Sequence, residues 1–176
     1  DLPMSEERSE LRQSMLPSLL EALQYNVARS QQNVRLFEVG KVFSIGKNGS
    51  EDFQEREVIG AAVTGEWGHA SWQSPAQPVD FFALKGVLEA YFAELNCSDR
   101  IRFVATDAIG QLHPGQTAYI YLGEELVGFI GKIHPVIQKE LDLSDTFVFE
   151  LLVEPLLAEG LQERVIQSVP KFPSMT

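Results

Sequence analysis

The chain has 176 residues, of which 44% are hydrophobic and 22% charged, the proportions of an ordinary folded domain and not of a disordered chain. Its formal net charge of −11 argues against nucleic-acid binding by this segment alone, since phosphate binding depends on clustered lysine and arginine. No apolar run reaches the roughly 18 residues that a membrane-spanning helix needs, and the single cysteine, Cys97, excludes an internal disulfide and indicates a cytoplasmic location.

The first predicted element is a helix over residues 16–30, because apolar side chains recur there at helical spacing: Leu16, Leu19, Leu20, Leu23 and Val27. A strand over residues 34–43 follows. It has apolar side chains on both faces, with Val34, Leu36 and Val42 on one and Phe37, Val39 and Phe43 on the other. Such a strand is typical of the centre of a sheet that is covered on two sides. Turn residues at 46–49 and an apolar stretch at 57–64 predict a hairpin.

The loop over residues 66–78 contains two tryptophans, Trp67 and Trp72, which we expect to fold onto the core or to seal a subunit contact. Asp80 then predicts the cap of a second helix, which ends near Leu95. Gly86 lies inside this helix, where glycine is less favourable than alanine by about 1 kcal/mol. We therefore expect a neighbouring element to approach closely at Gly86.

Four further strands are predicted at residues 101–105, 117–122, 126–133 and 146–153, with short helices at 135–141 and 154–159. Hairpins join successive strands, and helices intervene without strict alternation. This order predicts an α+β fold with a mainly antiparallel sheet flanked by helices, and argues against a doubly wound α/β fold.

The residues show no motif for catalysis or metal binding. The three histidines lack the spacing of a zinc pair, and His113 and His134, each followed by proline, are expected to bond backbone groups. Glu38 shares a strand face with apolar residues, so its carboxylate needs a partner. We expect a structural ion pair with Arg12 or Arg35, in preference to a general base. No catalytic residue and no metal ligand is assigned.

An ordered series of segments resembles one enzyme family. It comprises LRQSMLPSLLEALQYNVAR at 11–29, VRLFEVGKVF at 34–43, DFFALKGVLEAYFAEL at 80–95, LHPGQTAYIYLGEELVGFIGKIHPVI at 112–137, FVFELLVEPLL at 147–157 and KFPSM at 171–175. The series is similar to the β subunit of bacterial phenylalanyl-tRNA synthetases and covers nearly the whole chain. The resemblance implies that residues 1–169 form a module related to class II synthetase catalytic domains. Residues 170–176 would begin the linker to a C-terminal anticodon-binding domain.

The resemblance also implies that an ATP site has been lost. In active class II relatives, the strand like VRLFEVGKVF ends in Phe-Arg-x-Glu, whose arginine holds the α-phosphate of ATP. In this chain Ser44 and Gly46 stand in place of the arginine and the glutamate. Serine cannot reproduce the bidentate contacts of a guanidinium with phosphate. The third class II motif is missing as well, because residues 147–157 contain no glycine and no arginine. We expect no autonomous active site and no cofactor in this chain.

By resemblance, the parent enzyme contains two α and two β subunits and joins phenylalanine to tRNA-Phe with ATP and Mg²⁺, with the chemistry in α. We expect this module to be a non-catalytic scaffold that contacts the α subunit or the second β subunit, while other domains bind most of the tRNA. The candidate interface residues are Leu19, Leu23, Val27, Trp67 and Trp72. The alternative is a degenerate domain that retains nucleotide binding, or RNA binding through Arg29, Arg35, Lys41 and Lys47.

Overall fold

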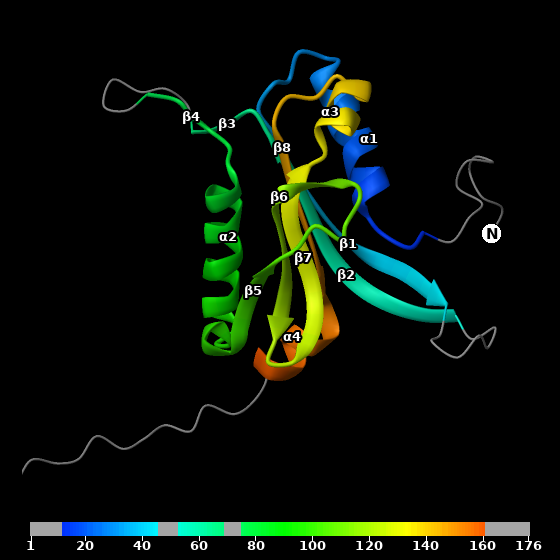
Figure 1. Ribbon diagram of the computed structural model, residues 1–176, viewed down its shortest axis with the longest axis vertical. Helices are drawn as coiled ribbons and strands as arrows, with labels where there is room; N and C mark the ends of the chain where they lie inside the picture. Colours follow the sequence, from blue (N-terminus) through cyan, green and yellow to red (C-terminus); the bar gives the residue numbers. More distant parts are fainter. Residues whose placement is uncertain (1–11, 46–52, 69–74, 161–176) are drawn as a thin grey trace, which may run out of the picture.

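The chain folds around a six-stranded antiparallel sheet (Figure 1). The computed structural model describes residues 12–45, 53–68 and 75–160. The strand order is β1-β2-β8-β7-β6-β5, and each neighbouring pair is antiparallel. The strands are β1 Val34–Ile45, β2 Phe53–Thr64, β5 Ile101–Ala105, β6 Leu112–Leu122, β7 Glu125–Ile133 and β8 Thr146–Leu152. A separate ribbon pairs β3, Glu66–Gly68, with β4, Gln77–Pro78.

The helices of the described chain begin at the signals that the sequence provides. They are α1 Leu16–Val27, α2 Phe81–Glu94, α3 Pro135–Glu140 and α4 Val153–Gly160, with a short 3-10 turn, η2, at Ser98–Arg100. Asp80 caps α2 as predicted, since its Oδ1 accepts a hydrogen bond from the Ala83 N–H at 2.6 Å. Both α1 and α3 have proline in their first turn, where a missing N–H leaves no bond unmade. None of the described helices combines the length and hydropathy needed to traverse a bilayer.

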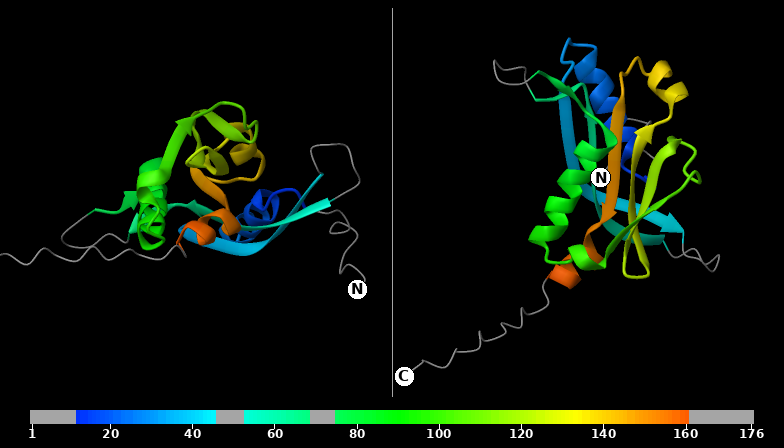
Figure 2. Two further views of the ribbon diagram at one scale, coloured as in Figure 1. Left: turned by 90° about the horizontal axis from the view of Figure 1, so that it is seen from below. Right: turned by 60° about the vertical axis from the view of Figure 1, so that its left-hand side comes forward.

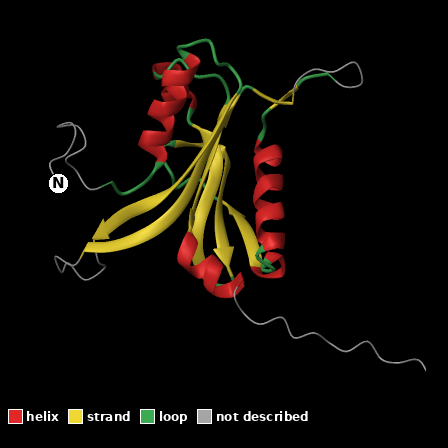
Figure 3. Cartoon of the chain, turned by 180° about the vertical axis from the view of Figure 1, so that it is seen from behind, coloured by secondary structure: helices red, strands yellow, loops and turns green. Residues whose placement is uncertain are grey.

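Different helices cover the two faces of the sheet (Figures 1 and 3). On the first face, which we call the α2 face, helices α2 and α4 pack on the strands through a buried cluster that includes Leu84, Leu88, Phe92, Ile130, Phe149, Leu151 and Leu156. On the second, the α1 face, helices α1 and α3 enclose a second cluster that includes Met15, Leu19, Leu23, Val58, Ala62, Ile133 and Val148. Two apolar clusters on opposite faces of one sheet are the layered arrangement of an α+β domain.

The predicted α+β fold is confirmed, but the predicted place of β1 is wrong. We expected a central strand, and β1 is an edge strand of the sheet. Its residues on the α1 face pack against α1, whereas Phe37 and Val39 on the α2 face are 76% and 52% exposed. The hairpin end of β1 and β2 projects beyond the helices (Figure 2). Apolar side chains on both faces of a strand do not reveal whether this chain covers both of them.

The expectation for Gly86 is also wrong. Gly86 is exposed on α2, and among the described residues no atom lies within 4 Å of the place that a Cβ would occupy. Three further predictions fall outside the described residues: the turn at 46–49, Trp72, and the linker at 170–176.

Candidate functional site

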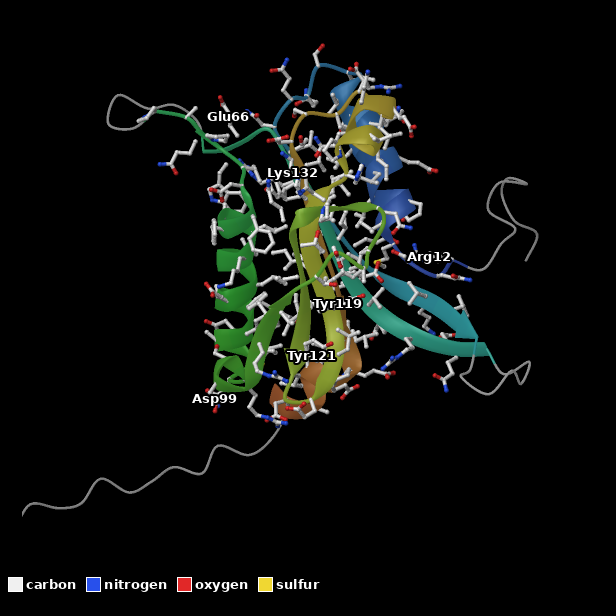
Figure 4. The ribbon with its side chains drawn as sticks, viewed as in Figure 1. Arg12, Glu66, Asp99, Tyr119, Tyr121 and Lys132 are labelled. Atoms are coloured by element: carbon white, nitrogen blue, oxygen red, sulfur yellow. The ribbon has the colours of Figure 1, made fainter. Side chains whose placement is uncertain are left out.

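A row of residues that pair across neighbouring strands crosses the α1 face from one edge of the sheet to the other. It takes one residue from each strand in order: Glu38, Gly60, Glu150, Phe129, Tyr119 and Val104. Residues paired across neighbouring strands share a face, so the row brings two carboxylates to the half that α1 covers. Its aromatic rings lie toward β6, where Tyr119 and Tyr121 are labelled in Figure 4.

Arg12 binds the first of these carboxylates beside β1 (Figure 4). Its Nη1 lies 2.7 Å from Oε1 of Glu38, and its Nε donates to the Lys41 carbonyl at 2.8 Å. Gly40 leaves room for the guanidinium, because a Cβ there would overlap Nη2. Of the two partners considered from the sequence, the structure pairs Glu38 with Arg12. Both side chains are about one-third exposed, so water screens the ion pair. The pair therefore positions the Arg12 side chain on β1 more than it stabilises the fold.

The second carboxylate, Glu150, anchors the start of α1. Its Oε2 accepts hydrogen bonds from the Met15 N–H at 2.7 Å and from the Ser14 hydroxyl at 2.8 Å. Met15 is the N-cap of α1 and offers no side-chain cap, so Glu150 satisfies a backbone donor that the helix leaves free. The sequence analysis missed this role, since 135 residues separate Glu150 from Met15 and no local motif connects them.

The position of the ATP-binding arginine of active relatives falls near the end of β1. There the backbone of Ser44 pairs with Gln54 of β2, whereas Gly46 lies outside the described residues. That Ser44 and Gly46 mark a lost nucleotide site therefore stays a prediction. Within the described chain, both carboxylates of the cross-strand row already hold groups of the segment that leads into α1.

An exposed apolar surface lies on the other side of the sheet, between β1 and α2. A groove of about 350 Å³ opens there, lined by Leu36, Phe37, Ile59, Ala61, Val63, Trp67, Leu84, Val87, Leu88, Tyr91, Phe149 and a single charged residue, Arg35. Beside it, Phe37 and Val39 of β1 are 76% and 52% exposed, and Val87 and Trp67 are 39% and 37% exposed. We call these four residues the β1–α2 surface. Clustered exposure of large apolar side chains marks an interaction site more often than scattered exposure does.

Arg35 holds the tryptophan of this surface in place. Its Nη2 donates to the Glu66 carbonyl at 2.7 Å and also to the Trp67 carbonyl, and its guanidinium carbon lies 5.3 Å from the centre of the indole ring. A ring fixed in this way loses little conformational freedom when it meets a partner. Trp67 thus lines the groove and stays exposed, and its sealing of a subunit contact remains a prediction.

The α1 residues predicted for a subunit interface lie elsewhere. Leu19 and Leu23 are only 3% and 0% exposed and belong to the core on the α1 face, so their apolar surface is already buried within the chain. Val27 is half-buried at the end of α1. The interface prediction is carried forward for Val27, Trp67 and Trp72 only.

The basic residues considered for RNA binding also have partners within the chain. Arg29 stacks on the Tyr25 ring, with 3.3 Å between guanidinium carbon and ring centre, and Lys41 pairs with Glu55. The hydrogen bond and charge of the Glu55 carboxylate raise the pKa of Lys41. Lys47 lies outside the described residues. The basic residues that the structure describes are therefore already bound to other groups of the chain and are not free to bind a phosphate backbone.

The histidines and the cysteine have structural roles. Nδ1 of His113 accepts from the Gly115 N–H at 3.0 Å, and Nδ1 of His134 accepts from the Val136 N–H at 3.3 Å, which confirms the predicted backbone bonding. Cys97 is fully buried, and burial raises the pKa of its thiol, so its reactive thiolate is disfavoured. Across the described residues, no group of three or more acidic, histidine or cysteine side chains is placed to hold a metal ion.

The fold itself defines a class of protein. Two structures of pyrrolysyl-tRNA synthetase from Desulfitobacterium hafniense match this chain with TM-scores of 0.60 and 0.56 at 13% and 14% sequence identity. Each match covers 83% of this chain and 48% of the other. The sheet and its helices are therefore those of a class II synthetase-like domain, which confirms the predicted fold class.

Sequence comparison then identifies the family. A profile described as the phenylalanyl tRNA synthetase beta chain CLM domain matches residues 1–153. Phenylalanine–tRNA ligase β subunits are 47% identical over 175 residues in Bacillus subtilis and 42% identical over 174 residues in Geobacillus kaustophilus, each over 99% of this chain. The chain belongs to the family of phenylalanyl-tRNA synthetase β-chain CLM domains, as its segments predicted. It spans 22% and 21% of the length of these two relatives.

Proposed function

We propose that this chain is a non-catalytic module of the β subunit of a phenylalanine–tRNA ligase and that it supports assembly of that enzyme. The parent enzyme would contain two α and two β subunits, use ATP and Mg²⁺ to charge tRNA-Phe in the cytoplasm, and carry its active site in α. Family membership over residues 1–153 supports the assignment of the chain to this parent enzyme, and the β1–α2 surface supports the scaffolding role.

The β1–α2 surface is the observation that carries the proposal. Phe37 and Val39 lie on an edge strand of the sheet, and both side chains are exposed. Removing apolar surface from water contributes about 25 cal/mol per Å², so covering these side chains and the adjacent groove is favourable for a partner of matching shape. A large exposed apolar side chain at a central position is also the usual anchor of a protein interface.

The test uses the intact β subunit that contains this chain, mixed with the α subunit. Phe37→Asp and Val39→Asp are expected to weaken co-elution with α, or association of two β subunits, by about tenfold or more, since each places a charge in an apolar contact. Val136→Asp is the matched control, because Val136 on α3 is 56% exposed and lies outside the β1–α2 surface. Assembly that is indifferent to both β1 substitutions would overturn the scaffolding role of this surface.

A second candidate function, retained nucleotide or RNA binding, is tested by two further measurements. Calorimetric titration of the 176-residue chain with ATP and with phenylalanine is expected to give no submillimolar binding, because Ser44 and Gly46 stand where active relatives have the arginine that holds the α-phosphate and the glutamate. Charge reversal at Arg29 and Lys41, which lie outside the β1–α2 surface, is expected to leave tRNA affinity of the whole enzyme unchanged. Submillimolar ATP binding, or a loss of tRNA affinity, would favour the second function.

A further inference from the structure

A cavity of about 450 Å³ opens on the α1 face, beside the start of α1. Its lining comes from four separate parts of the chain: the first turns of α1, the segment between β5 and β6, strand β7 and helix α3. The lining residues are Ser14, Leu16, Pro17, Leu20, Glu21, Ile109, Gln111, Phe129, Ile137 and Leu141. This volume and this apolar lining are typical of sites that bind small molecules.

The walls of this cavity are held by backbone hydrogen bonds, so the cavity exists before any ligand arrives. In the segment between β5 and β6, the Leu112 N–H donates to the Ile109 carbonyl at 2.9 Å, and the Gln111 carbonyl accepts from the His134 N–H at 2.9 Å. On the far wall, the Leu143 N–H donates to the carbonyl of Gln138 at 2.8 Å and fixes the end of α3. A preformed site avoids the free-energy cost of ordering loops upon binding.

The polar groups of the lining favour one sign of charge. Among the ten lining residues there is one carboxylate, Glu21, and no lysine, arginine or histidine. Glu21 is exposed, and within the described residues it has no ion-pair partner. The Ser14 hydroxyl is already bonded, since it donates to Glu150 and accepts from the Leu16 N–H. As far as the described residues go, a cationic group on an apolar ligand would therefore meet a carboxylate without an ion-pair partner, and the lining holds no opposing cation.

We propose that this cavity is a binding site for a small hydrophobic amine: a molecule with an aromatic or branched apolar body that fills the space lined by Phe129, Ile137 and Leu141, and a protonated nitrogen beside Glu21. The site lies on the face opposite the β1–α2 surface, and its occupation does not depend on the scaffolding role. The two inferences can therefore fail separately.

The direct test is a methyl-resolved NMR titration of the full 176-residue chain with 1-naphthylmethylamine. We expect saturable shifts, with a Kd of about 1 mM or tighter for twelve heavy atoms, in methyl signals of Leu16, Leu20, Ile109, Ile137 and Leu141. The neutral analogue 1-naphthylmethanol is expected to bind about threefold more weakly, and 1-naphthylacetate more weakly still, as suits a partly exposed ion pair. Glu21→Gln should remove the preference for the amine over the alcohol.

Two variants provide the structural control. Ile137→Trp fills the cavity and should abolish the shifts, whereas Leu157→Trp adds the same side chain on α4, where Leu157 is 43% exposed and remote from the cavity lining. Titration of the unmodified chain tests the proposal even if Ile137→Trp fails to fold. Absence of saturable shifts, shifts confined to Ile59, Leu84 and Val87 of the other groove, or equal binding of all three probes would overturn the proposal. So would displacement of the amine by the α subunit, which would make a protein segment the occupant.

Discussion

Glu150→Ala should destabilise this domain by detaching the start of α1 from β8. The carboxylate accepts two hydrogen bonds, from the Met15 N–H at 2.7 Å and from the Ser14 hydroxyl at 2.8 Å. Hydrogen bonds to charged groups contribute about 1.5–3 kcal/mol each, and the unpaired Met15 N–H adds a desolvation cost unless water reaches it. Glu150 is only half-buried, so water recovers part of this loss. We expect the free energy of unfolding to fall by about 2–4 kcal/mol.

The assay is urea unfolding at pH 7, followed by far-UV circular dichroism, with native-state hydrogen exchange of the α1 amides as the local readout. Ser14→Ala should cost about 1 kcal/mol, and the double variant with Glu150→Ala should cost less than the sum of the two, because both single changes remove the same bond. Glu154→Ala is the control, since Glu154 is exposed on α4 and a surface substitution of this kind changes stability by about 0.5 kcal/mol or less. Wild-type stability in Glu150→Ala, together with unchanged exchange in α1, would refute the reasoning.

Three further predictions concern other parts of the chain. Gly128→Ala should destabilise the fold by several kcal/mol, since the added Cβ would overlap a backbone carbonyl of β8. Gly86→Ala should stabilise it by about 1 kcal/mol, because the position is helical and open. Thermal unfolding of the two variants measures both effects. The pKa of Asp145 is lowered from its usual value of 3.8, chiefly by a hydrogen bond from Lys132, so its stabilisation is complete above pH 3.8 and is lost as the pH falls through the folded pKa. Asp145→Asn should therefore lower stability at pH 6, and this loss should shrink as the pH falls below 3.8; a loss that does not change on acidification would contradict this. The buried Cys97 thiol should react with a disulfide reagent about a thousandfold more slowly in the native chain than in urea, and rapid native labelling would show that the end of α2 opens readily.

The secondary structure could be predicted because its signals are local. The cap at Asp80 and the prolines that begin α1 and α3 act on backbone groups within a few residues, and the structure places helices where these signals stand. The turn at Gly123, which adopts a positive φ of 60°, likewise joins β6 to β7 as expected. These features depend on chain geometry and not on what surrounds the element.

The place of each element could not be predicted in the same way. The alternating apolar residues of β1 suit a strand covered on both faces, but strand order depends on pairings between distant segments, which place β1 at the edge. The same limit applies to α1, whose leucine stripe fits a partner and a core equally well; the structure buries Leu19 and Leu23 against the sheet. Glu150 had no signal at all, because its partners are a hydroxyl and a backbone N–H far away in sequence.

The two faces of the sheet would have different tasks under the proposed scaffolding role. A partly buried carboxylate is costly to the fold unless donors or cations satisfy it. Here Arg12 and the Ser14–Met15 backbone supply those partners, so the acidic residues hold a chain segment in place. On the opposite face, the described part of the chain leaves Phe37 and Val39 largely exposed, so a partner that covered them would remove apolar surface from water. Under the proposed scaffolding role, selection would act on the apolar edge of β1, and the carboxylates would be retained for folding alone.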